Sequence, residues 1–465
     1  MRTEEDSFGK VKVPSDAYYG SFTQRAVNNF PISRVGFQKE LIGAYALIKE
    51  FSAVANAELG NLDPRISKAI VLASREVVKG KHRDQFPVDV FQAGAGTSTN
   101  MNVNEVIANR ALEIMGHKKG NYKLINPNDH VNMSQATNDT FQSAVHMAAY
   151  CMIDSKLMPA LNRYQKQIEK KSGEFSKIIK SGRTHLMDAV PITLGQEFSG
   201  YSIEQEIREI KEVSDELLLL NIGGTAVGTG LNTNPRFKST FFRELNKGTG
   251  YHFRPVKNNF AMTQNLTTIA KASSALKELT LKLIKMANDI RLMSSGPYTG
   301  LKEITIPQVQ PGSSIMPGKI NPSMAEMLTM VCFRVMGNDA SITMAAQAGQ
   351  FELNVFGPLA AYNLLESIQI LSNGIDVFTT RCIAGIKPNK TALNYYFEHS
   401  SALATALSPK LGYATTAKLV KEAEKRNIGI RKLALEKKLL SKSELDQILK
   451  PSKLTKPNLP SKKKT

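Results

Sequence analysis

Four long stretches of the sequence have helical periodicity and few prolines, and this feature limits the possible folds more than any other. They cover residues 140–172, 196–221, 262–294 and 323–375. Each stretch is longer than an ordinary globular helix, and almost no run of alternating apolar and polar residues competes with them. Long helices joined by short loops bury their apolar faces against one another. The sequence therefore predicts an all-α fold with an elongated central bundle.

Shorter elements are expected on both sides of this central region. Apolar spacing and turn residues predict helices over residues 41–55 and 66–79, and another between the glycine cluster at 94–96 and Gly116. The end of the chain is typical of a small helical domain with a disordered basic tail. We predict an N-terminal helical domain (1–138), a central long-helix bundle (139–395) and a small C-terminal helical domain with a basic tail (396–465).

The strongly positive charge of the chain raises nucleic acid as a partner. Sixty Lys and Arg residues against 41 Asp and Glu residues give a net charge of +19, and residues 450–465 contain lysines but no acid. No zinc-finger spacing or aromatic RNA-binding pattern accompanies these lysines. A solvated basic surface with a frayed tail is therefore favoured over nucleic-acid binding, and such a surface also attracts small dianionic substrates.

Several other classes of protein are not expected. Cys151, Cys332 and Cys382 lie far apart without CxxC spacing, which is typical of reduced thiols. No histidine follows another by three or four residues, so no metal site is indicated. No apolar run reaches the roughly 18–20 residues that cross a bilayer, and the first residues lack the apolar segment of a secretory signal. We expect a cytoplasmic protein with no membrane partner.

Two polar stretches precede helical segments and are candidates for anion binding. Residues 94–102 (GAGTSTNMN) and 126–139 (NPNDHVNMSQATND) each place small and polar residues where a helix begins. Backbone N–H groups at a helix N-terminus can bind a carboxylate or a phosphate. The alternatives are an ordinary glycine-rich turn with a Thr or Ser cap for the first stretch, and a capped loop for the second.

Two further stretches carry residues with catalytic chemistry. Residues 181–191 contain His185 beside Thr184, for which a structural and a catalytic role are about equally favoured. Residues 311–322 (PGSSIMPGKINP) describe a loop that holds two serines and a lysine. Its glycines can act as hinges that let the loop close over a ligand and exclude water.

Together these stretches resemble a known family. The loop GSSIMPGKINP (312–322) is similar to the signature of the fumarase/aspartase superfamily, which argininosuccinate lyase and adenylosuccinate lyase share. The blocks GAGTSTNMN, NPNDHVNMSQATND, GRTHLMDAVPITLGQEF and GGTAVGTGLN resemble the other family blocks, in the family's order. The resemblance covers nearly the whole chain. It implies a three-domain all-α fold, a homotetramer whose active sites are shared between subunits, and reversible anti elimination from a small dicarboxylate to give fumarate, without a metal or organic cofactor.

The resemblance also implies roles for individual residues. Ser313 is the expected general base that takes the Cβ proton, and Lys319 and the loop N–H groups would stabilise its alkoxide. Lys319 and Asn321 would face the doubly charged aci-carboxylate that proton removal creates. Thr184 and His185 would contact the substrate, with Glu326 as the acid paired with His185. The remaining residues expected to bind carboxylates or orient the leaving group are Thr97, Ser98, Thr137, Asn138 and Ser314.

The leaving group is not fixed by the resemblance. The blocks GAGTS, DQFPVDV and MGHKKGNY and the pair Thr137-Asn138 resemble aspartate ammonia-lyases. GGTAVGTGLN and residues 326–330 and 351–356 are more similar to fumarases. We expect an aspartate ammonia-lyase, with class II fumarate hydratase as the second candidate and a non-catalytic binding protein of the same fold as a remote one.

Two positions depart from the family pattern. Ala136 replaces a serine that both subfamilies normally have, and Tyr298 stands where an arginine is usual. Losing one hydrogen bond to a charged group costs roughly 1.5–3 kcal/mol. The two departures therefore leave room for weaker binding or an altered substrate.

Overall fold

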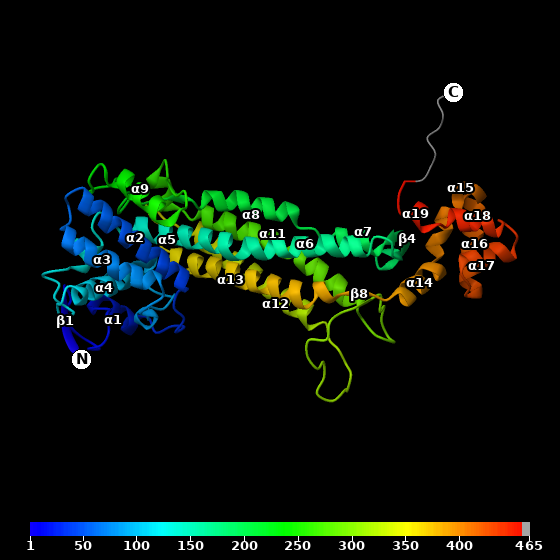
Figure 1. Cartoon of the computed structure of the whole chain (residues 1–465), viewed down its shortest axis with the longest axis horizontal. Coiled ribbons are helices and arrows are strands. Elements are labelled where there is room, and N and C mark those ends of the chain that lie inside the picture. The colour runs from blue at the N-terminus through cyan, green and yellow to red at the C-terminus, as the bar shows by residue number, and fades with distance from the viewer. Residues whose placement is uncertain (458–465) are drawn as a thin grey trace, which may run out of the picture. The chain divides into compact units, whose positions relative to one another are not determined.

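The computed structural model describes residues 1–457, and its elements are mainly helices, which confirms the all-α prediction (Figure 1). The chain forms two compact units. Unit 1 comprises residues 1–159, 205–280 and 331–372, and unit 2 comprises residues 160–204, 281–330 and 373–465. The three domains expected from the sequence remain a prediction, and the last lysines of the basic tail, in 458–465, lie outside the described residues.

The first part of the chain forms a short hairpin and five helices. They are β1 (Arg2–Asp6), β2 (Gly9–Val13), α1 (Ser21–Asn29), α2 (Lys39–Glu58), α3 (Pro64–Val78), α4 (Thr97–Ile114) and α5 (Thr137–Met152). The helices predicted over 41–55, over 66–79 and before Gly116 correspond to α2, α3 and α4. Local signals explain their ends, because Asp63 accepts a hydrogen bond from the Arg65 N–H at the start of α3, with Pro64 as its first residue.

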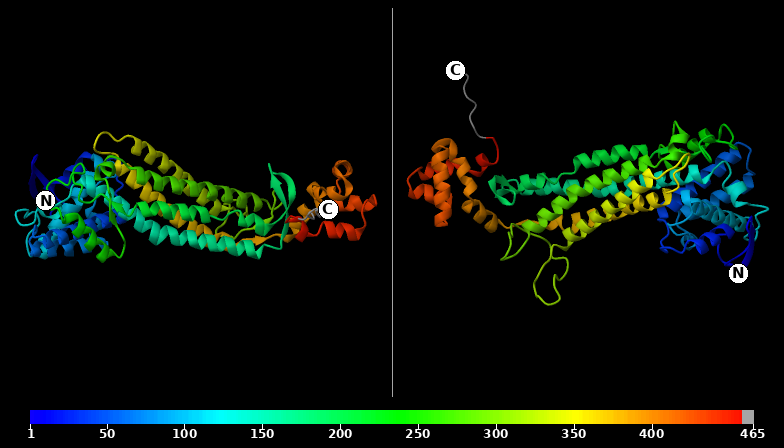
Figure 2. Two further views of the ribbon diagram at one scale, coloured as in Figure 1. Left: turned by 90° about the horizontal axis from the view of Figure 1, so that it is seen from above. Right: turned by 180° about the vertical axis from the view of Figure 1, so that it is seen from behind.

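The middle of the chain contains the long helices α11 (Thr267–Met293), α12 (Ser323–Gln347) and α13 (Gly357–Arg381) together with shorter ones. The shorter helices are α6 (Met158–Glu174), α7 (Leu194–Ser199), α8 (Glu204–Glu216), α9 (Phe237–Thr249) and α10 (Asn259–Gln264). The short strands β5 (Leu219–Leu220) and β6 (Arg254–Pro255) pair in parallel. The predicted stretch 323–375 is thus two helices joined by a loop, and both extra views show them beside α11 (Figure 2).

Polar bonds join these long helices within unit 1. Asp339 of α12 accepts hydrogen bonds from Ser273 and Lys277 of α11, each over 2.7 Å. Asn338 of α12 donates to Ser367 of α13 over 3.0 Å. Because a buried polar group without a partner is costly, these paired groups fix how the apolar helix faces align.

Unit 2 contains a β-hairpin whose strands were not predicted from the sequence. β3 (Ile179–Thr184) and β4 (Met187–Thr193) are antiparallel, with an irregularity between Ser181 and Gly182. A second small pair joins β7 (Ile304–Thr305) to β8 (Lys387–Pro388).

The last helices of unit 2 surround a separate apolar core. They are α14 (Lys390–His399), α15 (Ser408–Leu411), α16 (Tyr413–Arg426), α17 (Ile430–Glu436), α18 (Lys442–Ile448) and α19 (Pro451–Leu454). Leu403, Leu433 and Leu445 are fully buried in this core. Among residues 1–457, none of the helices is long and apolar enough to cross a membrane.

Candidate active site

The start of α4 lies against α5 because residue 96 is a glycine. Gly96 has a φ of +86°, and a Cβ atom at this position would lie 1.9 Å from Cδ2 of Phe141. Only glycine fits both the backbone conformation and this close approach. The turn places Thr97 and Ser98 in the first turn of α4, with Ser98 buried.

The start of α5 meets the start of α4 through one side-chain hydrogen bond. The amide of Asn100 donates to Oγ1 of Thr137 over 3.1 Å. Thr137 and Asn138 are the first residues of α5, and Ala136 precedes them as the N-cap without a side-chain hydrogen bond. Two helix N-termini therefore share one polar region in unit 1, and their N–H groups favour an anion.

A buried lysine lies beneath this region. The Lys49 ammonium donates to Oδ1 of Asn100, Oδ1 of Asn132 and Oε1 of Gln135 over 2.8 to 2.9 Å. Burial lowers the pKa of Lys49 from its ordinary value of 10.5 to about 7, and the nearby carboxylate of Asp139 opposes this change. Because Asn100 also holds Thr137, Lys49 fixes the geometry of both helix starts.

Asp139 ties a distant loop to the start of α5. Its Oδ1 accepts from the Ala136 N–H, and its Oδ2 accepts from the N–H groups of Gly223 and Thr225. Burial raises the pKa of Asp139 to about 6 despite these bonds. The amide of Asn138 donates to the carbonyl oxygen of Ala226 over 2.7 Å. The block GGTAVGTGLN is therefore part of the same region in unit 1.

In unit 2, the segment between β7 and α12 forms a loop that stands away from α12 (Figure 1). The Gly312 N–H donates to the carbonyl oxygen of Lys319 over 2.9 Å, and the Asn321 amide donates to the carbonyl oxygen of Gly312 over 2.6 Å. Oγ of Ser313 accepts hydrogen bonds from the backbone N–H groups of Ile315 and Met316, over 3.3 and 3.0 Å. Two donors on one hydroxyl oxygen favour negative charge there. Ser314 follows in the same loop and is exposed.

A cationic cavity of about 670 Å³ adjoins this loop within unit 2. Lys319 and Asn321 line it together with Arg291, Lys302 and Tyr298. Three cationic side chains around one cavity suit a substrate with two carboxylates. Tyr298 is 95% exposed and stands where the family pattern has an arginine.

His185 and Thr184 lie at the tip of the β3–β4 hairpin and are exposed. His185 and Leu186 both have positive φ values, of 54° and 61°, which describes a tight two-residue hairpin turn. The hairpin is anchored by the fully buried Glu303, which pairs with Lys180 over 3.0 Å and with Arg183 over 2.7 Å.

The predicted site residues thus form two groups. Unit 1 brings together Thr97, Ser98, Thr137 and Asn138, and unit 2 carries Thr184, His185, Ser313, Ser314, Lys319, Asn321 and Glu326. Glu326 lies in the first turn of α12. Within the described part of the chain, no hydrogen bond joins Glu326 to His185, and no cluster of three or more His, Cys, Asp or Glu residues could hold a metal ion.

Sequence reasoning missed Lys49, Arg291 and Lys302. Lys49 had a visible signal, because it shares a helical face with Tyr45, Ser52 and Asn56, all of which are buried. A lysine in such a row is unusual, since lysines are rarely fully buried. Arg291 and Lys302 gave no signal, because their common cavity depends on the turn between them.

Comparisons with known proteins identify the family of this chain. A family model described as Lyase matches residues 9–337, and one described as Fumarase C C-terminus matches residues 403–456. Aspartate ammonia-lyase of Bacillus sp is 47% identical over 100% of this chain and 99% of its own length. Fumarate hydratase class II of Helicobacter pylori is 47% identical over 98% of this chain and 99% of its own length. The solved structure of fumarate lyase:delta crystallin from Brucella melitensis has a TM-score of 0.95 and 42% identity, covering 98% of this chain and 100% of that one.

Proposed function

Because the chain belongs to the fumarase/aspartase superfamily and is a lyase, we propose that it converts L-aspartate to fumarate and ammonia. The reaction removes the Cβ proton and expels the ammonium group from opposite faces of the substrate. No organic cofactor or metal ion enters this proposal. In the proposed homotetramer, the small dicarboxylate would bind to the helix N-termini of α4 and α5 of one subunit and to Lys319 and Asn321 of another.

The orientation of the Asn138 amide is the observation that carries this choice of substrate. Its Nδ2 donates to the carbonyl oxygen of Ala226 over 2.7 Å, so its Oδ1 remains as an acceptor. An ammonium group has three donors and no acceptor. Asn138 is therefore suited to hold the amino group of aspartate, while Thr137 and the helix N-terminus face a carboxylate.

Ser313 is proposed as the general base. A serine hydroxyl removes a proton only when its alkoxide is stabilised. The two N–H groups that point at its Oγ supply that stabilisation together with the ammonium of Lys319. Ser313 and Lys319 line a smaller cavity of about 440 Å³ within the loop. Thr97, Ser98, Ser314 and Thr184 would bind the substrate. The pair of His185 and Glu326 is proposed to form between subunits.

A homotetramer with shared active sites is supported by an exposed apolar row on α12. Phe333 and Met344 are 60% and 67% exposed, and Gly337 and Ala340 lie between them at helical spacing. Such a row on one helix face is typical of helix packing between subunits. The cytoplasmic location stays a prediction.

Fumarate hydratase, which would convert L-malate to fumarate and water, is the second candidate. The relatives bear both names at similar identity, and the C-terminal match is to a fumarase model. A hydroxyl group can also donate to Oδ1 of Asn138, but it needs a proton to leave as water. The hydratase therefore requires an additional acid near Asn138, which the ammonia-lyase does not.

The deciding experiment follows the ultraviolet absorbance of fumarate formed from L-aspartate and, separately, from L-malate. Fumarate from aspartate alone supports the proposal, and fumarate from malate alone replaces it with the hydratase. Activity with neither would mean that Ala136 and Tyr298 mark another substrate or a non-catalytic protein.

Two serine variants separate catalysis from loop structure. Ser313→Ala should reduce the rate by roughly 10²–10⁴-fold, the usual contribution of a general base. Ser313→Asn keeps an acceptor for the N–H groups of Ile315 and Met316 but cannot form an alkoxide. If Ser313→Asn retains wild-type activity, Ser313 is a turn residue and not the base.

A further inference from the structure

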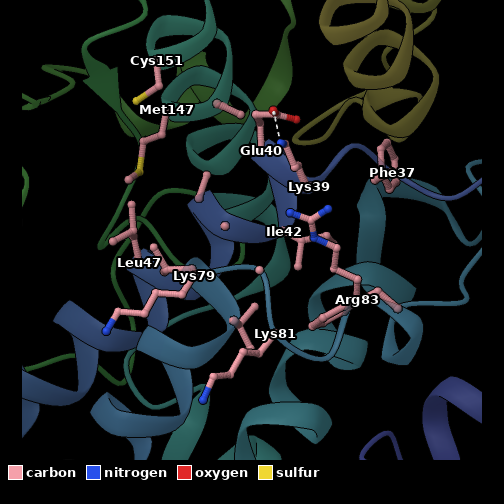
Figure 3. Close-up of a pocket in the computed structure, with 17 residues that line it drawn as sticks. Phe37, Lys39, Glu40, Ile42, Leu47, Lys79, Lys81, Arg83, Met147 and Cys151 are labelled. Atoms are coloured by element: carbon pink, nitrogen blue, oxygen red, sulfur yellow. Dashed lines mark ion pairs between the residues drawn. The ribbon is translucent and has the colours of Figure 1, made fainter. Parts of the chain in front are cut away.

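A second cavity in unit 1 has apolar walls and a positively charged rim (Figure 3). Its volume of about 470 Å³ is within the size range of small-molecule sites. The walls come from α2, from the end of α3 and from α5. Ile42, Val77 and Met147 represent these three elements, and each is at most 8% exposed.

Gly43 lines this cavity without contributing a side chain to it. It lies inside α2, and a Cβ atom built on it would meet nothing within 4 Å. Glycine is less favourable than alanine in a helix interior. A methyl group would therefore fit at this position, whereas a larger side chain would extend into the cavity.

The rim is cationic on the side of Arg83. Lys39, Lys79 and Lys81 also line the cavity, and its one acid, Glu40, is already paired with Lys156 over 2.8 Å. Figure 3 shows the guanidinium of Arg83 near Ile42, while the ammonium groups of Lys79 and Lys81 extend toward the edge of the view. Within residues 1–457, Arg83 has no ion-pair partner. A free guanidinium beside an apolar wall is complementary to a carboxylate that carries an apolar chain.

We propose that this cavity binds a medium-chain monocarboxylate. The carboxylate accepts two hydrogen bonds from Arg83, and the alkyl chain packs along Gly43 against Ile42, Val77 and Met147. A dicarboxylate fits poorly, because its second charge would be buried against apolar side chains without a partner. The site is thus chemically distinct from the region at the starts of α4 and α5.

Isothermal titration calorimetry of the full-length protein with octanoate tests the proposal. Octan-1-ol has the same chain without the charge, and octanedioate adds a carboxylate at the far end. We expect one saturable octanoate site per chain, with octan-1-ol and octanedioate binding at least tenfold more weakly. The absence of saturable octanoate binding, or equal binding of all three compounds, would overturn the proposal.

Three variants locate the site. Gly43→Leu fills the cavity, Gly43→Ala is the matched control that leaves it open, and Arg83→Gln removes the anchoring charge. We expect wild-type affinity for octanoate in Gly43→Ala and at least tenfold weaker binding in the other two, with unchanged Tm and fumarate formation. Wild-type affinity in Gly43→Leu or in Arg83→Gln would contradict the assignment. If Gly43→Leu does not fold, Arg83→Gln still tests the proposal, because residue 83 is exposed and its substitution leaves the core unchanged.

Discussion

Replacing Lys49 by methionine tests the electrostatic account of the region at the starts of α4 and α5. Methionine keeps the length of the side chain but removes the buried ammonium. Oδ1 of Asn100 and Oε1 of Gln135 would then have no hydrogen-bond donor among the described residues. A buried acceptor left unpaired costs roughly 1–3 kcal/mol, so this loss amounts to roughly 2–6 kcal/mol.

The charge of Lys49 acts in the opposite direction, and its effect depends on pH. Burial lowers the pKa of Lys49 from 10.5 to about 7, which corresponds to roughly 5 kcal/mol because one pKa unit is worth about 1.4 kcal/mol. Between pH 7 and 10.5 the unfolded chain holds this proton and the folded chain does not. The free energy of unfolding of the wild type therefore rises with pH in this window, and below pH 7 the full penalty is present.

The two effects nearly cancel at pH 7 and separate as the pH rises. We expect Lys49→Met to have wild-type stability within about 3 kcal/mol at pH 7. Relative to the wild type, it should then lose about 1.4 kcal/mol for each further pH unit up to pH 10. Urea unfolding of both proteins at pH 7, 8, 9 and 10, at equal protein concentration, measures this difference.

Lys68→Met is the matched control, because Lys68 is an exposed lysine on the neighbouring helix α3. Its difference from the wild type should not change with pH. A pH-independent difference for Lys49→Met as well would refute the reasoning, since it would mean that burial does not release the proton of Lys49 in this range.

Three other substitutions test single features of the structure. Gly96→Ala should destabilise the protein by roughly 2–4 kcal/mol, because the new methyl group contacts Phe141 and the backbone is strained. The control Gly116→Ala, whose methyl group meets nothing within 4 Å, should cost only about 1–2 kcal/mol. Equal losses in urea unfolding would contradict this. Glu303→Gln leaves Lys180 and Arg183 without their shared carboxylate and should lower the free energy of unfolding by roughly 3–5 kcal/mol. The control Asp376→Asn, in the exposed pair with Arg163, should lower it by less than about 1 kcal/mol. Tyr298→Arg adds a cation to the cavity of Lys319 and should lower the KM for the dicarboxylate by about tenfold; an unchanged KM would show that residue 298 does not face the substrate.

The elements that the sequence predicted are those determined by residues within the element itself. α2 follows from the spacing of Leu41, Tyr45 and Ile48, and the start of α3 follows from Asp63 and Pro64. These signals act within one helix, so they need no knowledge of the neighbouring elements.

The β3–β4 hairpin could not be predicted in the same way. Its turn residues, His185 and Leu186, adopt positive φ values without the Asn-Gly or Asp-Gly pair that marks such turns. Its strands contain Gly182 and Pro191, which are unfavourable in a strand. The hairpin forms because Glu303, more than a hundred residues later, pairs with it, and such a contact leaves no local pattern.

For the candidate site too, the sequence predicted local features but not the contacts between distant residues. The motifs identified the residues of each group, but the environment of each group depends on side chains such as Lys49 and Arg291 that the motifs do not contain. The base proposed here, Ser313, lies on a loop in which Ile315 is 84% exposed. An alkoxide in contact with water is a weak catalyst, because water solvates the charge that the site must hold for the transition state. Elimination therefore requires that another surface cover this loop, and a second copy of the chain in the proposed homotetramer would supply it.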